Sequence, residues 1–90
     1  MTTTTLDPTT EVSAADRRAA RAARTAQEAR EVYDRTDDER KRENARCAAL
    51  VASQAQACAG DAREYIGLMK DARWMLRYAI VGERAYELAW

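Results

Sequence analysis

A long stretch of helix-forming residues dominates this chain, because neither glycine nor proline occurs from Thr9 to Ala59. Both residues weaken helices, proline by lacking an amide hydrogen and glycine by its large backbone entropy. Alanine, the strongest helix former, occurs 20 times in the 90 residues, whereas valine, isoleucine and aromatic residues are few. The sequence therefore predicts an all-α fold without a sheet.

Two positions divide the chain into helices. The segment Thr36-Asp37-Asp38-Glu39 matches a capping box, in which the threonine caps a new helix and the glutamate reaches back to it. Gly60 is a helix stop, and Asp61 can cap the helix that follows. We therefore expect three helices, over about residues 13–35, 37–59 and 61–89. Asp7-Pro8 and Ser13 are alternative starts of the first helix.

Three helices with short connections predict a small antiparallel three-helix bundle. It forms a single domain over residues 9–90, after a flexible threonine-rich tail over residues 1–8. The alternative is a long helical hairpin that dimerises, in which the first two segments are one helix and the third folds back on it.

The apolar residues predict which helix faces are buried. The first helix has a small-residue stripe, and the second has a face of larger residues with Gln54 at its centre. The third helix is apolar on two sides, so we expect it to lie between two neighbours. The stripe on the first helix consists of Val12, Ala15, Ala19, Ala22, Ala26, Ala29 and Tyr33, and the face of the second helix consists of Cys47, Leu50, Val51 and Cys58. The broader face of the third helix consists of Tyr65, Leu68, Met69, Ala72, Met75, Leu76, Ala79 and Tyr86. Its second face consists of Trp74, Tyr78, Val81, Ala85 and Leu88.

Several chemistries are excluded by residue types that the chain lacks. Without histidine there is no Ser-His-Asp or Cys-His arrangement and no histidine metal site. Cys47 and Cys58 are three turns apart on one helix, about 16 Å, which is beyond the reach of a disulfide. The glycines form no phosphate-binding loop. We therefore expect no enzymatic activity, no cofactor and no metal.

The charges and the apolar runs bear on location. Fifteen basic and fifteen acidic residues give a net charge of zero, so attraction to nucleic acid or to an anionic membrane would need a local patch. No signal peptide is recognisable, and the longest apolar run, Cys47 to Ala52, is too short to span a membrane. We expect a cytoplasmic protein without a membrane partner, located in the host cytoplasm if a phage encodes it.

The third helix holds the candidate partner-binding residues, which combine the tryptophan, tyrosine and arginine found at binding hot spots. They are Trp74, Tyr78, Val81, Leu88, Trp90, Arg73 and Arg77. The leading hypothesis is a non-enzymatic interaction protein that occludes or bridges a protein partner, as an inhibitor from a phage or mobile element would, or that self-assembles, for example as a homodimer.

The first helix supports an alternative, a nucleic-acid-associated protein. Four arginines lie opposite its alanine stripe and could contact phosphates, namely Arg17, Arg18, Arg21 and Arg24. However, Glu28 and Glu31 follow, and no aromatic residue is interleaved to stack on bases. Nucleic acid is therefore the less favoured partner.

Overall fold

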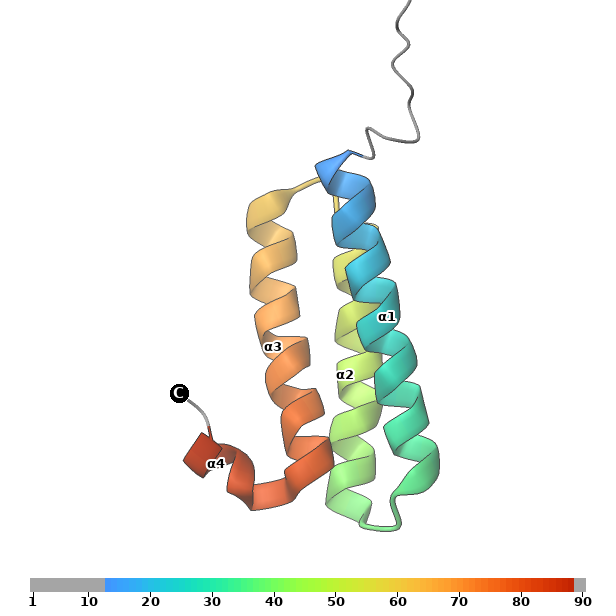
Figure 1. Ribbon diagram of the computed structural model, residues 1–90, viewed down its shortest axis with the longest axis vertical. Coiled ribbons are helices and arrows are strands. Elements are labelled where there is room, and N and C mark those ends of the chain that lie inside the picture. Colours follow the sequence, from blue (N-terminus) through green and yellow to red (C-terminus); the bar gives the residue numbers. More distant parts are fainter. Residues whose placement is uncertain (1–12, 89–90) are drawn as a thin grey trace, which may run out of the picture.

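The computed structural model describes residues 13–88, and the side chains of residues 13–86. Three helices, α1 (Ala14–Arg35), α2 (Glu39–Ala57) and α3 (Ala62–Val81), form an antiparallel bundle (Figure 1). A 3-10 turn, η1 (Gly82–Arg84), and a short helix, α4 (Ala85–Leu88), follow. The three-helix bundle is thereby confirmed. The alternative long hairpin is wrong, because α1 ends at Arg35 and α2 returns beside it.

Local capping sets where the helices begin. The Ser13 hydroxyl accepts a hydrogen bond from the Asp16 amide at 3.0 Å and caps α1. The alternative start at Asp7-Pro8 lies outside the described residues. At the start of α3, the Asp61 carboxylate accepts from the amides of Arg63 and Glu64 at 3.1 and 3.2 Å, as expected. Side chains two or three residues from the amides they bond thus explain both helix starts.

The break between α1 and α2 lies where the capping box predicted it, but a different residue caps α2. The Asp38 carboxylate accepts from the amides of Arg40 and Lys41 at 2.9 and 3.1 Å. Thr36 instead ends α1, and its hydroxyl accepts from the Asp38 amide at 3.3 Å. The expected start of the second helix at residue 37 is corrected to Glu39, because the carboxylate two residues beyond the threonine takes the capping position.

The core of the bundle consists largely of alanine. The buried face of α1 is Ala22, Ala26 and Ala29, as predicted, with Val32 in place of Tyr33, which is half-buried like Ala15 and Ala19. The buried face of α2 is Ala45, Ala48, Ala52 and Ala55, so the predicted face around Gln54 is wrong. Leu50 is 53% exposed, Gln54 is exposed, and Cys47, Val51 and Cys58 are half-buried. Two facing alanine stripes let α1 and α2 approach closely, which moves the larger α2 side chains to the edges.

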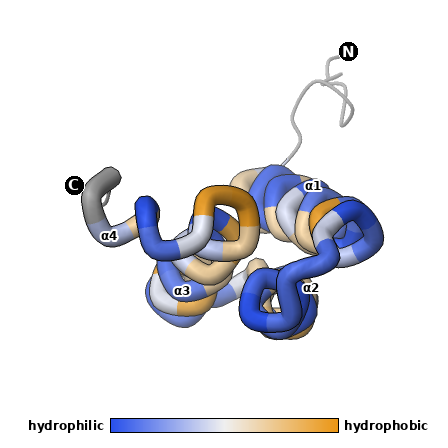
Figure 2. The backbone as a smooth tube through the Cα atoms, turned by 90° about the horizontal axis from the view of Figure 1, so that it is seen from below, coloured by the Kyte–Doolittle hydropathy of each residue, from blue (hydrophilic) through white to orange (hydrophobic). Residues whose placement is uncertain are grey.

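The larger buried side chains come from α3, which contributes Tyr65, Met69, Ala72, Leu76 and Ala79. In the middle of the bundle each helix supplies one alanine to a single layer, formed by Ala26, Ala52 and Ala72. Seen along the bundle, α1, α2 and α3 surround a common interior and α4 lies outside it (Figure 2). Helices α1 and α3 contact each other much less than either contacts α2.

The expected third helix over residues 61–89 is interrupted at Gly82, which has a φ of 66° that residues with a Cβ rarely adopt. The chain turns there, and α4 lies beside α3 on the side away from α1 and α2. Tyr86, which was expected in the core, is 67% exposed. Its ring contacts the rings of Trp74 and Tyr78, with centroids 5.4 and 6.2 Å away. The face of α3 that carries Trp74 and Tyr78 is therefore partly covered by Tyr86 of α4.

Candidate functional site

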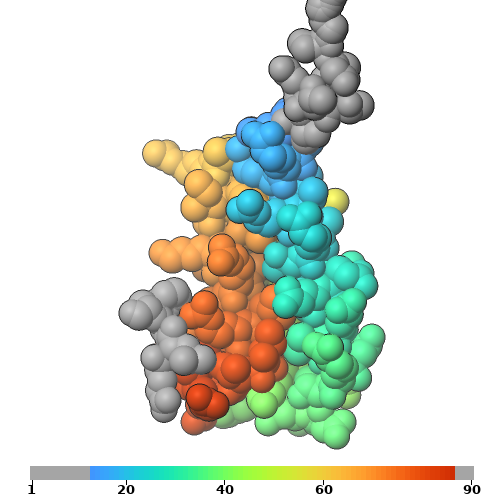
Figure 3. Space-filling model, in the orientation of Figure 1, coloured from blue at the N-terminus to red at the C-terminus, as the bar shows by residue number. Residues whose placement is uncertain are grey.

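A groove runs between α1 and α3, which lie side by side on one face of the molecule (Figure 3). It consists of two depressions of about 410 and 370 Å³ that share Arg73 and Arg77. We call it the α1–α3 groove. Helix α1 lines it with Arg21, Thr25 and Glu28, and α3 lines it with Tyr65, Ile66, Met69, Lys70, Arg73, Trp74, Leu76, Arg77, Ile80 and Val81.

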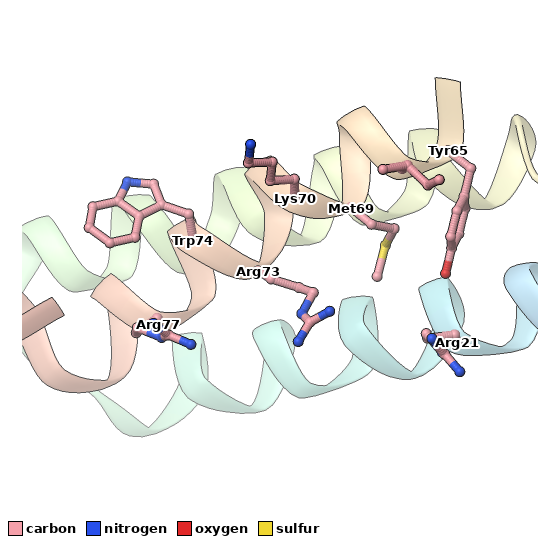
Figure 4. Close-up of a pocket in the computed structure, with 8 residues that line it drawn as sticks. Arg21, Tyr65, Met69, Lys70, Arg73, Trp74 and Arg77 are labelled. Atoms are coloured by element: carbon pink, nitrogen blue, oxygen red, sulfur yellow. The ribbon is translucent and has the colours of Figure 1, made fainter. Parts of the chain in front are cut away.

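Residues four apart on a helix lie one above the other, so α3 presents two adjacent rows to the groove. The inner row is Tyr65, Met69, Arg73 and Arg77, and the outer row is Ile66, Lys70 and Trp74. In Figure 4 the Met69 and Arg73 side chains extend toward α1, whereas those of Lys70 and Trp74 lie on the opposite side of α3. The inner row changes from buried apolar side chains to exposed arginines along the helix.

The groove is strongly basic although the whole chain is neutral. Its lining includes four exposed cations, Arg21, Lys70, Arg73 and Arg77, and one carboxylate, Glu28. Clustered like charges produce a local potential that the net charge of a protein does not reveal. The α1–α3 groove is therefore suited to an anionic ligand.

Large apolar side chains accompany these cations. Ile66 is 62% exposed and Ile80 is 49% exposed, which is unusual for isoleucine. Between them lies Trp74, which is half-buried and contacts Tyr86 at the outer edge of the groove. Exposed apolar surface bordered by charge is typical of a site that contacts another molecule.

Tyr65 closes one end of the groove. Its side-chain hydroxyl is buried and has no hydrogen-bond partner among the described residues. Figure 4 shows the hydroxyl pointing toward α1 beside Arg21. Arg18 covers the Tyr65 ring, with its guanidinium 5.9 Å from the ring centroid, and its Nε donates to the Ala59 carbonyl at 2.7 Å. This end of the groove is thus fixed by contacts between α1, α3 and the preceding loop.

The structure brings only some of the predicted partner-binding residues together. Arg73, Trp74, Arg77 and Val81 line the α1–α3 groove. Tyr78 lies elsewhere, in a small depression beside Gly82 and α2. Leu88 ends α4 without a described side chain, and Trp90 lies outside the described residues.

The four arginines proposed for nucleic acid are divided between different surroundings. Arg21 lines the groove, whereas Arg18 is held against Tyr65 and the Ala59 carbonyl. Arg24 is exposed on α1, and Arg17 has an interaction partner within the protein. The arginines therefore do not form one continuous surface on α1.

Sequence reasoning missed several groove residues, above all Ile66, Lys70 and Ile80. The spacing of Lys70, Arg73 and Arg77 along one side of the third helix was a usable signal for a basic strip. The participation of Arg21 could not be deduced, because residues 21 and 73 line one groove only after the bundle forms.

A second cluster of polar side chains lies on α2, away from the groove. Arg46 is 2.5 Å from Glu43, and their hydrogen bond lowers the pKa of the carboxyl and raises the pKa of the guanidinium. The Cys47 sulfur is 3.6 Å from the same carboxylate. Both cysteines are free. The contacts of Arg46 and Cys47 with the Glu43 carboxylate explain why these side chains lie together, so the cluster does not indicate a ligand site.

Residues 13–88 contain no group of three or more cysteine and acidic side chains placed to hold a metal ion. None of the described helices is long and apolar enough to cross a membrane.

The chain matches no protein-family model, no curated protein and no solved structure.

Proposed function

We propose that this protein is a non-enzymatic interaction module that binds a protein partner through the α1–α3 groove and thereby occludes or bridges that partner. The observation that carries the proposal is the pairing of exposed isoleucines and a tryptophan with four cations along one groove. An inhibitor encoded by a phage or mobile element would act in this way.

The composition of the groove supports a protein partner. Tryptophan and arginine are enriched among the residues that contribute most to protein–protein binding, and here both Trp74 and Arg73 line the groove. The clefts between helices of a bundle are also common binding sites. Because α1 and α3 contact each other little, an additional segment can lie against both.

Site-specific photo-crosslinking in the cells that make the protein tests this proposal. A photoreactive phenylalanine analogue replaces Ile66 or Ile80 in the groove, and Gln56, exposed on α2, is the matched control position. We expect both groove positions to give the same discrete protein adduct and the control to give none. Absence of that adduct, or equal labelling from Gln56, would contradict the proposal. Light scattering on the purified chain identifies self-assembly.

Nucleic acid is the second candidate, and it is favoured because Arg21 lines the same groove as Lys70, Arg73 and Arg77. It predicts binding to DNA or RNA that is lost when Arg17, Arg21 and Arg24 are changed to glutamate. The affinity would also fall steeply with salt, because bound phosphates release counterions. No gel shift at low salt would exclude this candidate.

A further inference from the structure

We infer that the occupant of the α1–α3 groove is an amphipathic helix of a partner protein, with acidic residues on both sides of its apolar stripe. This inference rests on the proposed function and adds the class of partner. It follows from the length of the groove, from what its walls can bond and from the placement of its charges.

The length of the groove suits a helix of moderate size. Its lining on α3 extends from Tyr65 to Val81. At 1.5 Å per residue, this corresponds to about 24 Å. A partner helix of about 16 residues covers that distance and places four or five side chains of one apolar stripe against the groove.

The walls of the groove favour a helix over an extended segment. Both walls are helices, whose backbone groups are already bonded within α1 and α3, so the groove presents side chains rather than a free strand edge. An extended segment would have to leave its own amides and carbonyls unpaired against Ile66, Met69 and Leu76. A helix satisfies its backbone internally and can bury an apolar stripe there.

The charges determine which helix fits. Arg21 and Arg73 lie on the side of the groove next to α1, and Lys70 lies on the outer side (Figure 4). A partner helix therefore meets Arg21 and Arg73 on one flank of its apolar stripe and Lys70 on the other, and Glu28 is the one carboxylate in the lining. Glutamate or aspartate at these flanking positions complements the groove, whereas lysine there is repelled.

The apolar lining disfavours nucleic acid as the occupant. A phosphate backbone would bind the cations but would leave Ile66 and Ile80, which are 62% and 49% exposed, without an apolar partner. An acidic amphipathic helix uses both kinds of side chain. A duplex or single strand is therefore an alternative outcome of the test below.

Two synthetic 16-residue peptides test the inference on the full chain. Both carry the same leucine stripe, flanked by glutamate in one peptide and by lysine in the other, with a fluorescein label for anisotropy. We expect the glutamate peptide to bind at least ten-fold more tightly. The double variant Lys70→Glu/Arg73→Glu should reverse this preference. The control Arg35→Glu/Arg63→Glu makes the same charge change at exposed positions outside the groove and should leave the preference intact.

Equal binding of the two peptides, or binding of neither, overturns the inference. So does a preference unaffected by Lys70→Glu/Arg73→Glu when circular dichroism shows that the variant is folded. Displacement of the labelled glutamate peptide by an unlabelled oligonucleotide overturns the inference as well. So does self-association of the chain that excludes the peptide from the groove.

Sequencing the adduct formed at Ile66 separates this inference from the proposed function. A discrete protein adduct whose crosslinked segment is a helix with net negative charge supports both. A discrete adduct to a basic or extended segment refutes the acidic helix as the occupant, but it remains consistent with the proposed function of binding a protein partner. Absence of a groove-specific adduct refutes the proposed function itself.

Discussion

The substitution Ala52→Leu tests whether the alanine layer at the middle of the bundle is close-packed. Ala26, Ala52 and Ala72 meet there, and each is at most 2% exposed. Leucine adds three carbon atoms, which would stabilise the protein by about 2 kcal/mol if a void received them. In a close-packed layer the same atoms force the helices apart and cost about 1–3 kcal/mol. A void therefore predicts a higher free energy of unfolding for Ala52→Leu, and a close-packed layer predicts a lower one. We expect the lower value.

Urea denaturation followed by circular dichroism at 222 nm measures this change. With an m value of about 1 kcal/mol/M for a protein of this size, the midpoint should fall by about 1–3 M. Ala20→Leu is the matched control, because Ala20 is exposed on α1 and the change there should stay within about 0.5 kcal/mol. A higher midpoint for Ala52→Leu than for the unsubstituted chain would refute the close packing of α1 and α2 through alanine.

Three further substitutions probe the turn after α3, a helix start and the closed end of the groove. Gly82→Ala should destabilise the protein by about 1–3 kcal/mol, because the glycine has a positive φ; thermal unfolding measures this, and an unchanged melting temperature would contradict it. Asp38→Ala should cost about 1 kcal/mol in urea denaturation through loss of the α2 cap, whereas Asp37→Ala, at a position that caps neither helix, should not. Tyr65→Phe should leave stability unchanged or raise it by about 1 kcal/mol, because the hydroxyl is buried without a partner; a clear loss of stability would show that the hydroxyl is bonded.

The helix boundaries were largely predictable because they depend on neighbouring residues. The Ser13 and Asp61 caps and the break after Thr36 involve bonds between residues two or three apart. The interruption at Gly82 was missed, since the apolar pattern continues across it into Tyr86. A glycine within an apolar pattern is compatible with a continuing helix, and here the backbone adopts a positive φ instead.

The buried face of α2 was not predictable from burial energies alone. That helix carries two stripes of similar spacing, one of alanine and one that includes Cys47, Val51 and Gln54. Larger side chains gain more from burial, which favoured the second stripe. The structure buries the alanines, because the distance between α1 and α2 depends on both helices at once.

The chemistry of the groove was partly present in the third helix. The spacing of Arg73, Trp74 and Arg77 indicated a basic and aromatic surface there. The sequence could not indicate that Arg21 joins this surface while Arg18 is held against Tyr65. Only the pairing of α1 with α3 separates the two arginines.

By itself, the sequence determined that this protein is helical, that the chain breaks near Thr36 and that Asp61 caps α3, because these properties arise from backbone propensity and nearby hydrogen bonds. Only the tertiary structure decided that alanine fills the core, that α4 covers part of the aromatic face, and that cations from α1 and α3 share one groove. Those features depend on distances between residues far apart in the chain, which helix packing sets and local pattern does not.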